Sequence, residues 1–93
     1  MHTLIIYDIT DDKIRSRVSD ECIAHGLTRI QKSAFIGVIN NQVRKSLIKK
    51  LEKILGENRG NIQIFLICDN DIRFRKVISS GDYSPEEGDI LFL

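Results

Sequence analysis

One carboxylate, Asp8, interrupts an otherwise apolar segment near the start of the chain, residues 4–9. Burying an unpaired carboxylate is costly, so this side chain needs a partner or water. Two interpretations are open: an exposed acid at a strand end that caps a turn or meets an arginine, or a ligand for a hard cation. Mg²⁺ takes one or two carboxylates and keeps several waters, so one aspartate per subunit is sufficient. Two copies of Asp8 brought together by a two-fold axis would repel each other unless a divalent cation lay between them.

Basic side chains are concentrated in residues 29–53, although the net charge of the whole chain is only +1. This stretch holds seven lysines and arginines against one acid, Glu52, whereas residues 82–89 hold four acids and no base. Lys45, Lys49 and Lys53 recur every four residues and therefore fall in one row on a helix. Such a row is usually a solvated helix face. The alternative is a row of phosphate contacts, which the shortage of acidic partners favours.

Motifs of common catalytic and cofactor sites are absent from the sequence. It has no Walker loop, no Gly-x-Gly-x-x-Gly, no zinc cluster and no Ser/His/Asp order. His2 and His25 have no partners at metal-ligand spacing, and the acids at 11–12 are explained by a helix N-terminus. Cys22 and Cys68 are expected to be reduced, buried thiols, with a single disulfide between them as the alternative.

The chain has 93 residues, of which 42% are hydrophobic and 29% charged. These values are ordinary for a soluble globular domain and exclude a disordered, collagen-like or low-complexity chain. We therefore expect a single domain over residues 1–93. No window approaches the roughly 18 apolar residues of a membrane span, and the charge of Asp8 follows the first apolar run at once. We accordingly expect no signal peptide, no membrane anchor and a cytoplasmic protein.

Hydrophobic periodicity predicts alternating strands and helices. The expected elements are strands at 4–9, 28–39 and 62–68, helices at 12–25 and 42–55, a turn at 69–71, a strand or irregular stretch at 72–79, a polar loop at 80–88 and a short apolar tail. If the second strand is paired with its neighbour as a hairpin, the order becomes β-α-β-β-α-β. That order is typical of an α+β, ferredoxin-like domain, an antiparallel sheet with two helices on one face.

The other face of such a sheet would be left uncovered by the two helices. The strands at 4–9 and 62–68 are nevertheless apolar on both faces. An exposed apolar surface of that size is unusual for a monomer. The sequence therefore predicts a homodimer whose helix-free sheet faces pack against each other. The tail at 89–93 is long enough to add a strand to the edge of the partner's sheet.

Three segments are more specific than composition or periodicity. Residues 7–13 read YDITDDK, residues 15–18 read RSRV, and residues 26–37 read GLTRIQKSAFIG. Together they closely resemble the family of small CRISPR-associated proteins that partner the CRISPR integrase in spacer acquisition. Members of this family are also described as CRISPR-associated endoribonucleases. The resemblance extends over nearly the whole chain.

This resemblance implies a ferredoxin-like homodimer with sheets packed face to face and C-terminal strands exchanged. It implies Mg²⁺ at the dimer interface, bound by Asp8. Family members are reported to cut single-stranded RNA or double-stranded DNA, whereas in the integration complex the dimer acts as a scaffold and ruler for DNA. The residues that match those implicated in nuclease activity are Tyr7, Asp8, Arg15, Arg17, Arg29 and Phe35.

Three functions therefore stand as hypotheses. The first is a homodimeric scaffold of CRISPR adaptation that works with the integrase and contacts nucleic-acid phosphates through Arg15, Arg17, Arg29, Lys45, Lys49 and Lys53. The second is a Mg²⁺-dependent endonuclease, in which Asp8 holds the cation, arginines neutralise the phosphate, and Tyr7 and Phe35 position the strand. The third is a ferredoxin-like regulatory module that binds a small molecule between subunits and has no role with nucleic acids.

Overall fold

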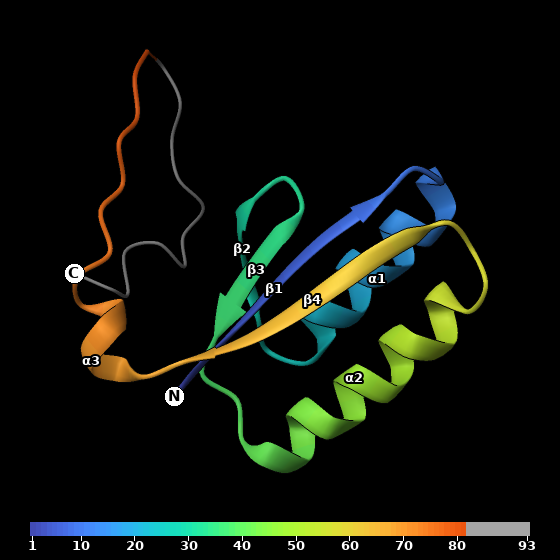
Figure 1. The fold of residues 1–93 in the computed structure, drawn as a ribbon, viewed down its shortest axis with the longest axis horizontal. Helices are drawn as coiled ribbons and strands as arrows, with labels where there is room; N and C mark the ends of the chain where they lie inside the picture. The colour runs from blue at the N-terminus through green and yellow to red at the C-terminus, as the bar shows by residue number, and fades with distance from the viewer. Residues whose placement is uncertain (82–93) are drawn as a thin grey trace.

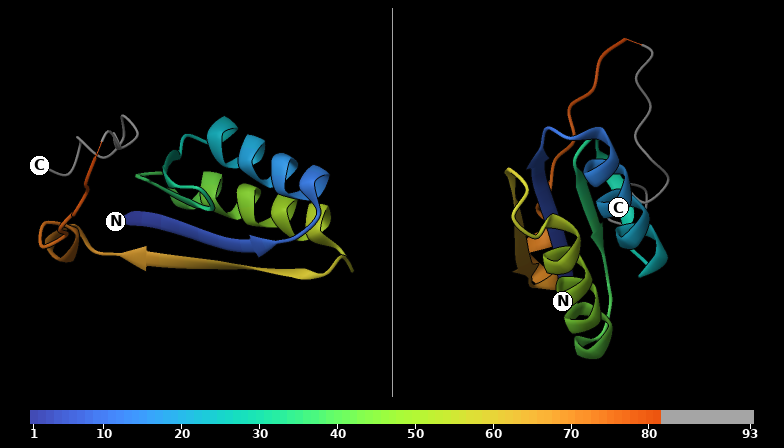
Figure 2. Two further views of the ribbon diagram at one scale, coloured as in Figure 1. Left: turned by 90° about the horizontal axis from the view of Figure 1, so that it is seen from above. Right: turned by 90° about the vertical axis from the view of Figure 1, so that its right-hand side faces the viewer.

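Residues 1–81 are described by the computed structural model, and they form one four-stranded sheet and three helices. Figure 1 shows the elements, and Figure 2 shows that the two long helices lie on the same face of the sheet. The strands are ordered β2-β3-β1-β4, and every neighbouring pair is antiparallel. The expected α+β, ferredoxin-like fold is thus confirmed. The elements are β1 (His2–Ile9), α1 (Asp12–Ala24), β2 (Thr28–Gln31), β3 (Ala34–Gly37), α2 (Asn41–Leu55), β4 (Gly60–Ile67) and α3 (Asp69–Ile72).

Strand β1 occupies the centre of the sheet, where it pairs with β3 on one side and β4 on the other. Its odd-numbered side chains are buried, and Ile5, Tyr7 and Ile9 belong to the main core. Its even-numbered side chains therefore point to the face that carries no helix. Alternation along this one strand decides which of its residues pack against the helices.

Both long helices begin at a polar N-cap residue, Asp11 for α1 and Asn40 for α2. The Asp11 side chain accepts a hydrogen bond of 2.9 Å from the Ile14 amide, and the Asn40 side chain accepts one of 2.8 Å from the Val43 amide. The helices pack on the sheet through Val18 and Cys22 of α1 and, from α2, Leu47, Leu51 and Ile54. Cys22 and Cys68 are free thiols, so the alternative of a disulfide is wrong; Cys68 is only half-buried.

One expected strand, at 28–39, is wrong in its extent. The structure divides it into β2 and β3, which form a hairpin around a turn at Lys32 and Ser33. The turn contains no glycine, proline, asparagine or aspartate, and its one turn-favouring residue, Ser33, is a weak signal. A register shift between Arg29 and Gln31 marks an irregularity in β2. The hairpin supplies the strand that completes the ferredoxin-like order.

The segment after β4 also differs from part of the expectation. Residues expected to form a turn at 69–71 begin the short helix α3, and no strand forms over 72–79, so the irregular alternative is the correct one. The His2 ring lies 3.1 Å from the Asp69 carboxylate and joins the start of β1 to α3. This hydrogen bond and the nearby amino terminus hold the pKa of Asp69 below its usual value. The expected tail strand at 89–93 lies outside the described residues.

The helix-free face of the sheet carries apolar side chains, as the sequence predicts, but on β1 and β4 it also carries the polar residues Asp8, Asn61 and Gln63. On β1 and β4 it presents Leu4, Ile6 and Phe65, of which Ile6 is 41% exposed and Phe65 43% exposed. On the β2 side, residues 75–79 lie beside the strand and share a cavity with Ile30 and Gln31. In the described part of the chain, the half of this face formed by β1 and β4 is therefore exposed to solvent, whereas residues 75–79 lie beside the β2 half. Within residues 1–81, every helix is too short or too polar to cross a lipid bilayer.

Candidate functional site

An aromatic and arginine cluster lies between the sheet and α1. The rings of Tyr7 and Phe35 stack with centroids 6.2 Å apart and planes inclined by 15°. The guanidinium carbon of Arg29 lies 4.8 Å from the Phe35 ring centroid, in cation–π geometry. Three of the residues implied by the family resemblance are thus neighbours, although they come from three different strands.

Hydrogen bonds fix the orientation of Arg29. One terminal nitrogen donates to the Lys32 carbonyl at 2.6 Å, and the other donates to the hydroxyl of Ser19 on α1. The side chain therefore joins β2, the hairpin turn and α1. Among residues 1–81 no carboxylate forms an ion pair with it, so its charge is not neutralised by an acid in this part of the chain.

Two groups beside Arg29 are held in their neutral form. Burial raises the pKa of the Tyr7 hydroxyl, and the positive charge of Arg29 opposes that rise in part. Burial likewise raises the pKa of the Cys22 thiol to about 12. At neutral pH both groups are protonated, so neither the hydroxyl nor the thiol is poised as a base or nucleophile here.

Arg15 is also used within the fold. Its guanidinium donates to the carbonyls of Ile9 at 3.2 Å and Thr10 at 3.3 Å, and it pairs with the Asp12 carboxylate. These contacts tie the end of β1 to the first turn of α1. Arg15 therefore stabilises the loop that connects β1 to α1.

A shallow cavity of about 240 Å³ opens beside this cluster. Its charged lining consists of three cations and one acid, so it is electropositive. Four of its residues, Asp12, Ser16, Ser19 and Lys32, were not among the residues expected to act in a site. Lys32 could be recognised as part of the basic stretch, but no signal in the sequence distinguishes the two serines. The cavity is lined by Tyr7, Asp12, Arg15, Ser16, Ser19, Arg29 and Lys32.

Asp8 lies on the opposite face of the sheet from this cluster. It is the next residue after Tyr7 in β1, and adjacent residues of a strand point to opposite faces. Tyr7 is 3% exposed and faces the helices, whereas Asp8 is exposed on the helix-free face. The six residues implied for nuclease activity therefore do not form one constellation within a single chain. Their catalytic roles stay predictions.

The remaining expected phosphate contacts are exposed on the helices. Arg17 lies on α1, and Lys45, Lys49 and Lys53 form the expected row on α2. None of these four side chains forms an ion pair or hydrogen bond with another residue in the part of the chain that the structure describes. On α2 only Lys50 reaches an acid, Glu21, at 3.9 Å.

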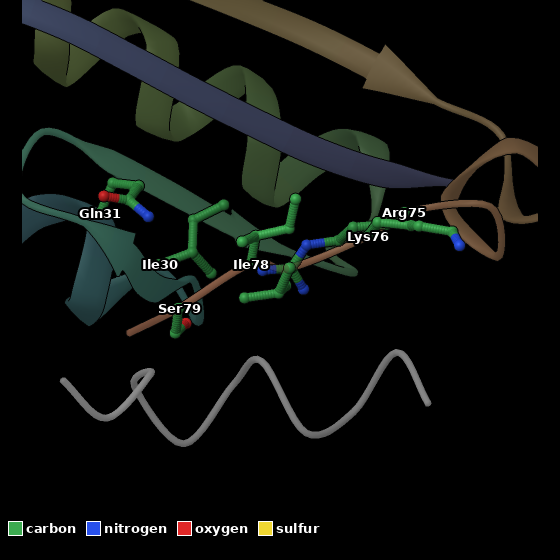
Figure 3. Close-up of a pocket in the computed structure, with 7 residues that line it drawn as sticks. Ile30, Gln31, Arg75, Lys76, Ile78 and Ser79 are labelled. Atoms are coloured by element: carbon green, nitrogen blue, oxygen red, sulfur yellow. The ribbon is translucent and has the colours of Figure 1, made fainter. Parts of the chain in front are cut away.

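A second basic segment follows α3 and was not recognised in the sequence. Arg73, Arg75 and Lys76 alternate there with the exposed apolar residues Phe74 and Val77. Figure 3 shows residues of this segment beside Ile30 and Gln31 of β2, around a cavity of about 380 Å³. The segment adds positive charge at the edge of the sheet formed by β2.

The residues around Asp8 suit a hard cation in their donor chemistry. The carboxylate is exposed, and the facing position on β4 carries Asn61, whose side-chain amide is also an oxygen donor. No group of three His, Cys, Asp or Glu side chains able to hold a metal occurs within residues 1–81. One chain thus offers one carboxylate, a number that Mg²⁺ accepts when water supplies other ligands.

The family follows from comparison with known proteins. Residues 1–75 match the family profile described as "CRISPR associated protein Cas2". The chain belongs to the Cas2 family. A "CRISPR-associated endoribonuclease Cas2" from Desulforudis audaxviator (strain MP104C) is 39% identical over 87 residues, which cover 94% of this chain and 82% of that protein. The family resemblance noted in the sequence is confirmed.

Two further Cas2 relatives extend the comparison. The crystal structure of Streptococcus pyogenes Cas2 at pH 6.5 superposes with a TM-score of 0.74 at 23% identity, covering 85% of this chain and all of that one, and supports the fold. A Thermoproteus tenax protein named "CRISPR-associated endonuclease Cas1/endonuclease Cas2 fusion" is 34% identical over 67 residues. Those residues cover 72% of this chain and 25% of the fusion protein.

We predict that Arg29→Lys lowers the free energy of unfolding by about 1–2 kcal/mol, measured by urea denaturation. Lysine keeps the positive charge but cannot donate to Ser19 and Lys32 with one rigid fork while stacking on Phe35. The matched control is Arg17→Lys on the exposed side of α1, for which we expect a change below about 0.5 kcal/mol. Equal effects of the two substitutions would contradict the structural role of Arg29.

Proposed function

We propose that this Cas2-family chain is a nucleic-acid-binding scaffold of CRISPR adaptation that acts as a homodimer. The observation that carries the proposal is the set of exposed, unpaired cations on the helical layer, Arg17, Lys45, Lys49 and Lys53. Cations without acidic partners are free to exchange counterions for phosphates, which is the main source of affinity in non-specific nucleic-acid binding.

The spacing of the α2 lysines suits a phosphate backbone. A rise of about 1.5 Å per residue separates successive members of the row by about 6 Å along the helix axis. Lysine contacts to phosphates position a protein on nucleic acid without reading its bases. Helices α1 and α2 lie together on one side of the sheet, so Arg17 belongs to the same layer (Figure 2). We therefore expect steep salt dependence and little sequence preference.

A second copy of the chain is the partner that best fits the helix-free face. Ile6 and Phe65 are each more than two-fifths exposed there, beside the half-buried Leu4. Packing two such faces together would remove this apolar surface from water. It would also leave the lysine rows of both copies on the outside, which doubles the cationic surface.

The proposed protein partner is a CRISPR integrase of the Cas1 type. The Thermoproteus tenax relative carries Cas1 and Cas2 in one polypeptide, as its name states. Two activities joined in one chain are held at high effective concentration, which favours a shared task. In this proposal the present chain supplies the binding surface, and the integrase supplies strand transfer.

A second candidate function is a Mg²⁺-dependent endonuclease centred on Asp8. It is supported by the exposed position of this carboxylate on the helix-free face and by the endoribonuclease names of the relatives. Mg²⁺ bound there would supply Lewis-acid stabilisation of charge on a scissile phosphate. The chain itself would contribute the carboxylate of Asp8, and a face-to-face dimer would bring a second Asp8 toward the first. The regulatory-module hypothesis has no comparable observation in its favour.

The scaffold proposal predicts how salt affects binding to duplex DNA. Replacing Lys45, Lys49 and Lys53 together by glutamine should make the slope of log K against log salt shallower by about 0.9 for each lost contact. Fluorescence anisotropy between about 50 and 200 mM salt measures this slope. Lys50→Gln is the control, because Lys50 is already near Glu21. Wild-type affinity that does not change over this range would overturn the proposal.

The dimer proposal predicts a change in mass. Phe65→Glu should convert a wild-type dimer, of twice 10.7 kDa, into a monomer, because a buried charge would face the second copy. Light scattering after size-exclusion chromatography gives the mass directly. Leu66→Glu is the matched control, since Leu66 is the next residue of β4, is 49% exposed and points to the other face. A wild-type protein that is monomeric at micromolar concentration would refute the dimer.

The endonuclease candidate predicts that Asp8→Asn lowers cleavage of single-stranded RNA or duplex DNA by about 100-fold or more, with binding unchanged. Amide for carboxylate keeps the shape of the side chain but removes the charge that would hold the cation. Chelation of Mg²⁺ should have the same effect on the wild type. Cleavage by a folded, dimeric Asp8→Asn protein at the original rate would eliminate this candidate and leave the scaffold proposal intact.

A further inference from the structure

Asp8 and Asn61 face each other across the pairing of β1 with β4. Their Cα atoms are partners in the antiparallel register, and both side chains are exposed. Directly opposed residues lie on the same face of a sheet, with Cβ atoms about 4.5–5.5 Å apart. Asn61 therefore shares the helix-free face with Asp8, whereas Tyr7 and its partner Ile62 share the helical face.

The corner of the sheet around this pair differs from the rest of the open face. Leu4 and Ile6 precede Asp8 on that face of β1, and Phe65 lies further along β4. Gln63, opposite Ile6, lies between Asn61 and Phe65 on the same face, so one carboxylate and two side-chain amides adjoin the apolar residues. Oxygen atoms of these two types are ligands that Mg²⁺ and Mn²⁺ use in proteins.

The backbones of β1 and β4 approach each other closely beside the Asp8–Asn61 pair. Gly60, next to Asn61, has φ +150°, and a Cβ at that position would lie 2.9 Å from the Asp8 carbonyl oxygen. Only glycine permits this approach without a shift of the backbone. The two strands are therefore fixed against each other immediately beside the Asp8–Asn61 pair, which reduces the ordering that a shared ligand would require.

We propose that the side-chain amide oxygen of Asn61 is a second ligand for the divalent cation at Asp8. This inference rests on the cation site of the proposed endonuclease function and adds a residue to it. An amide adds an oxygen ligand without adding charge, and it avoids the repulsion that two carboxylates directly opposed on adjacent strands would suffer. In a face-to-face dimer, two aspartates and two asparagines would provide four oxygen ligands and two negative charges for one divalent cation.

Isothermal titration of the full chain with Mn²⁺, as a spectroscopically useful substitute for Mg²⁺, tests the assignment. We expect Asn61→Ala to weaken Mn²⁺ binding by about 10-fold or more. Gln31→Ala, which removes an exposed amide from the opposite edge strand β2, is the matched control and should bind as the wild type does.

Asn61→Asp tests whether a side chain at position 61 lies within reach of the cation at Asp8. Without metal, the new carboxylate would face Asp8, so we expect a lower melting temperature than that of the wild type. With Mn²⁺ present, the two carboxylates would bind the cation more tightly, so the rise in melting temperature on adding Mn²⁺ should exceed that of the wild type. A rise no larger than that of the wild type would show that a side chain at position 61 does not reach the cation, whereas the role of the native amide is read from Asn61→Ala.

The outcomes distinguish this inference from the function on which it rests. If Asp8→Asn abolishes Mn²⁺ binding while Asn61→Ala and Asn61→Asp bind as the wild type does, Asn61 is not a ligand and the Asp8 site stands. If the wild type binds no Mn²⁺ at millimolar concentration, the cation site and the inference are both wrong. The scaffold proposal, which depends on the lysine row, is independent of either result.

Discussion

The pairing of β1 with two neighbours is the constraint on which the other features depend. Because β1 is hydrogen-bonded to β3 and β4 along both edges, its side chains can only alternate between the two faces of the sheet. The two long helices cover one of these faces. Tyr7 is consequently held in the core beside Phe35, and Asp8, one residue later, is exposed on the other face. A single peptide unit separates two environments with different chemistry.

Arginines and lysines of this chain fall into two groups with different surroundings. Arg15 and Arg29 are used within the fold, where their guanidinium groups bridge strand ends, a hairpin turn and α1. Arg17 and the row on α2 have no partner within residues 1–81. Loss of the first group is expected to change stability, and under the proposed scaffold function loss of the second would change affinity for nucleic acid. The two effects can be separated by mutation because the two groups share no residue: one group makes hydrogen bonds within the fold, and the other faces solvent.

The small size of the chain gives a physical reason for apolar residues on the helix-free face. A domain of 93 residues buries a smaller fraction of its surface than a larger one, so its own core gives limited stability. Apolar residues on both faces of β1 and β4 provide a second surface for burial, which one chain fills only in part, with residues 75–79 beside β2. In the proposed homodimer, a second copy of the chain covers the remainder. The carboxylate at the corner of that surface would then lie near the interface.

Much of the fold and part of the site could be predicted from the sequence, because both depend on local periodicity. The four-residue repeat of α2 placed Lys45, Lys49 and Lys53 on one exposed face, and the acids at 11–12 marked the start of α1. The hairpin at Lys32 and Ser33 was missed, because its turn uses residues that also occur within strands. Only the tertiary structure decided that Tyr7, Arg29 and Phe35 meet beside Ser19, that Asp8 is turned away from them, and that Asn61 lies opposite it. These relations depend on strand register and helix packing, which join residues far apart in the chain and leave no local pattern in its sequence.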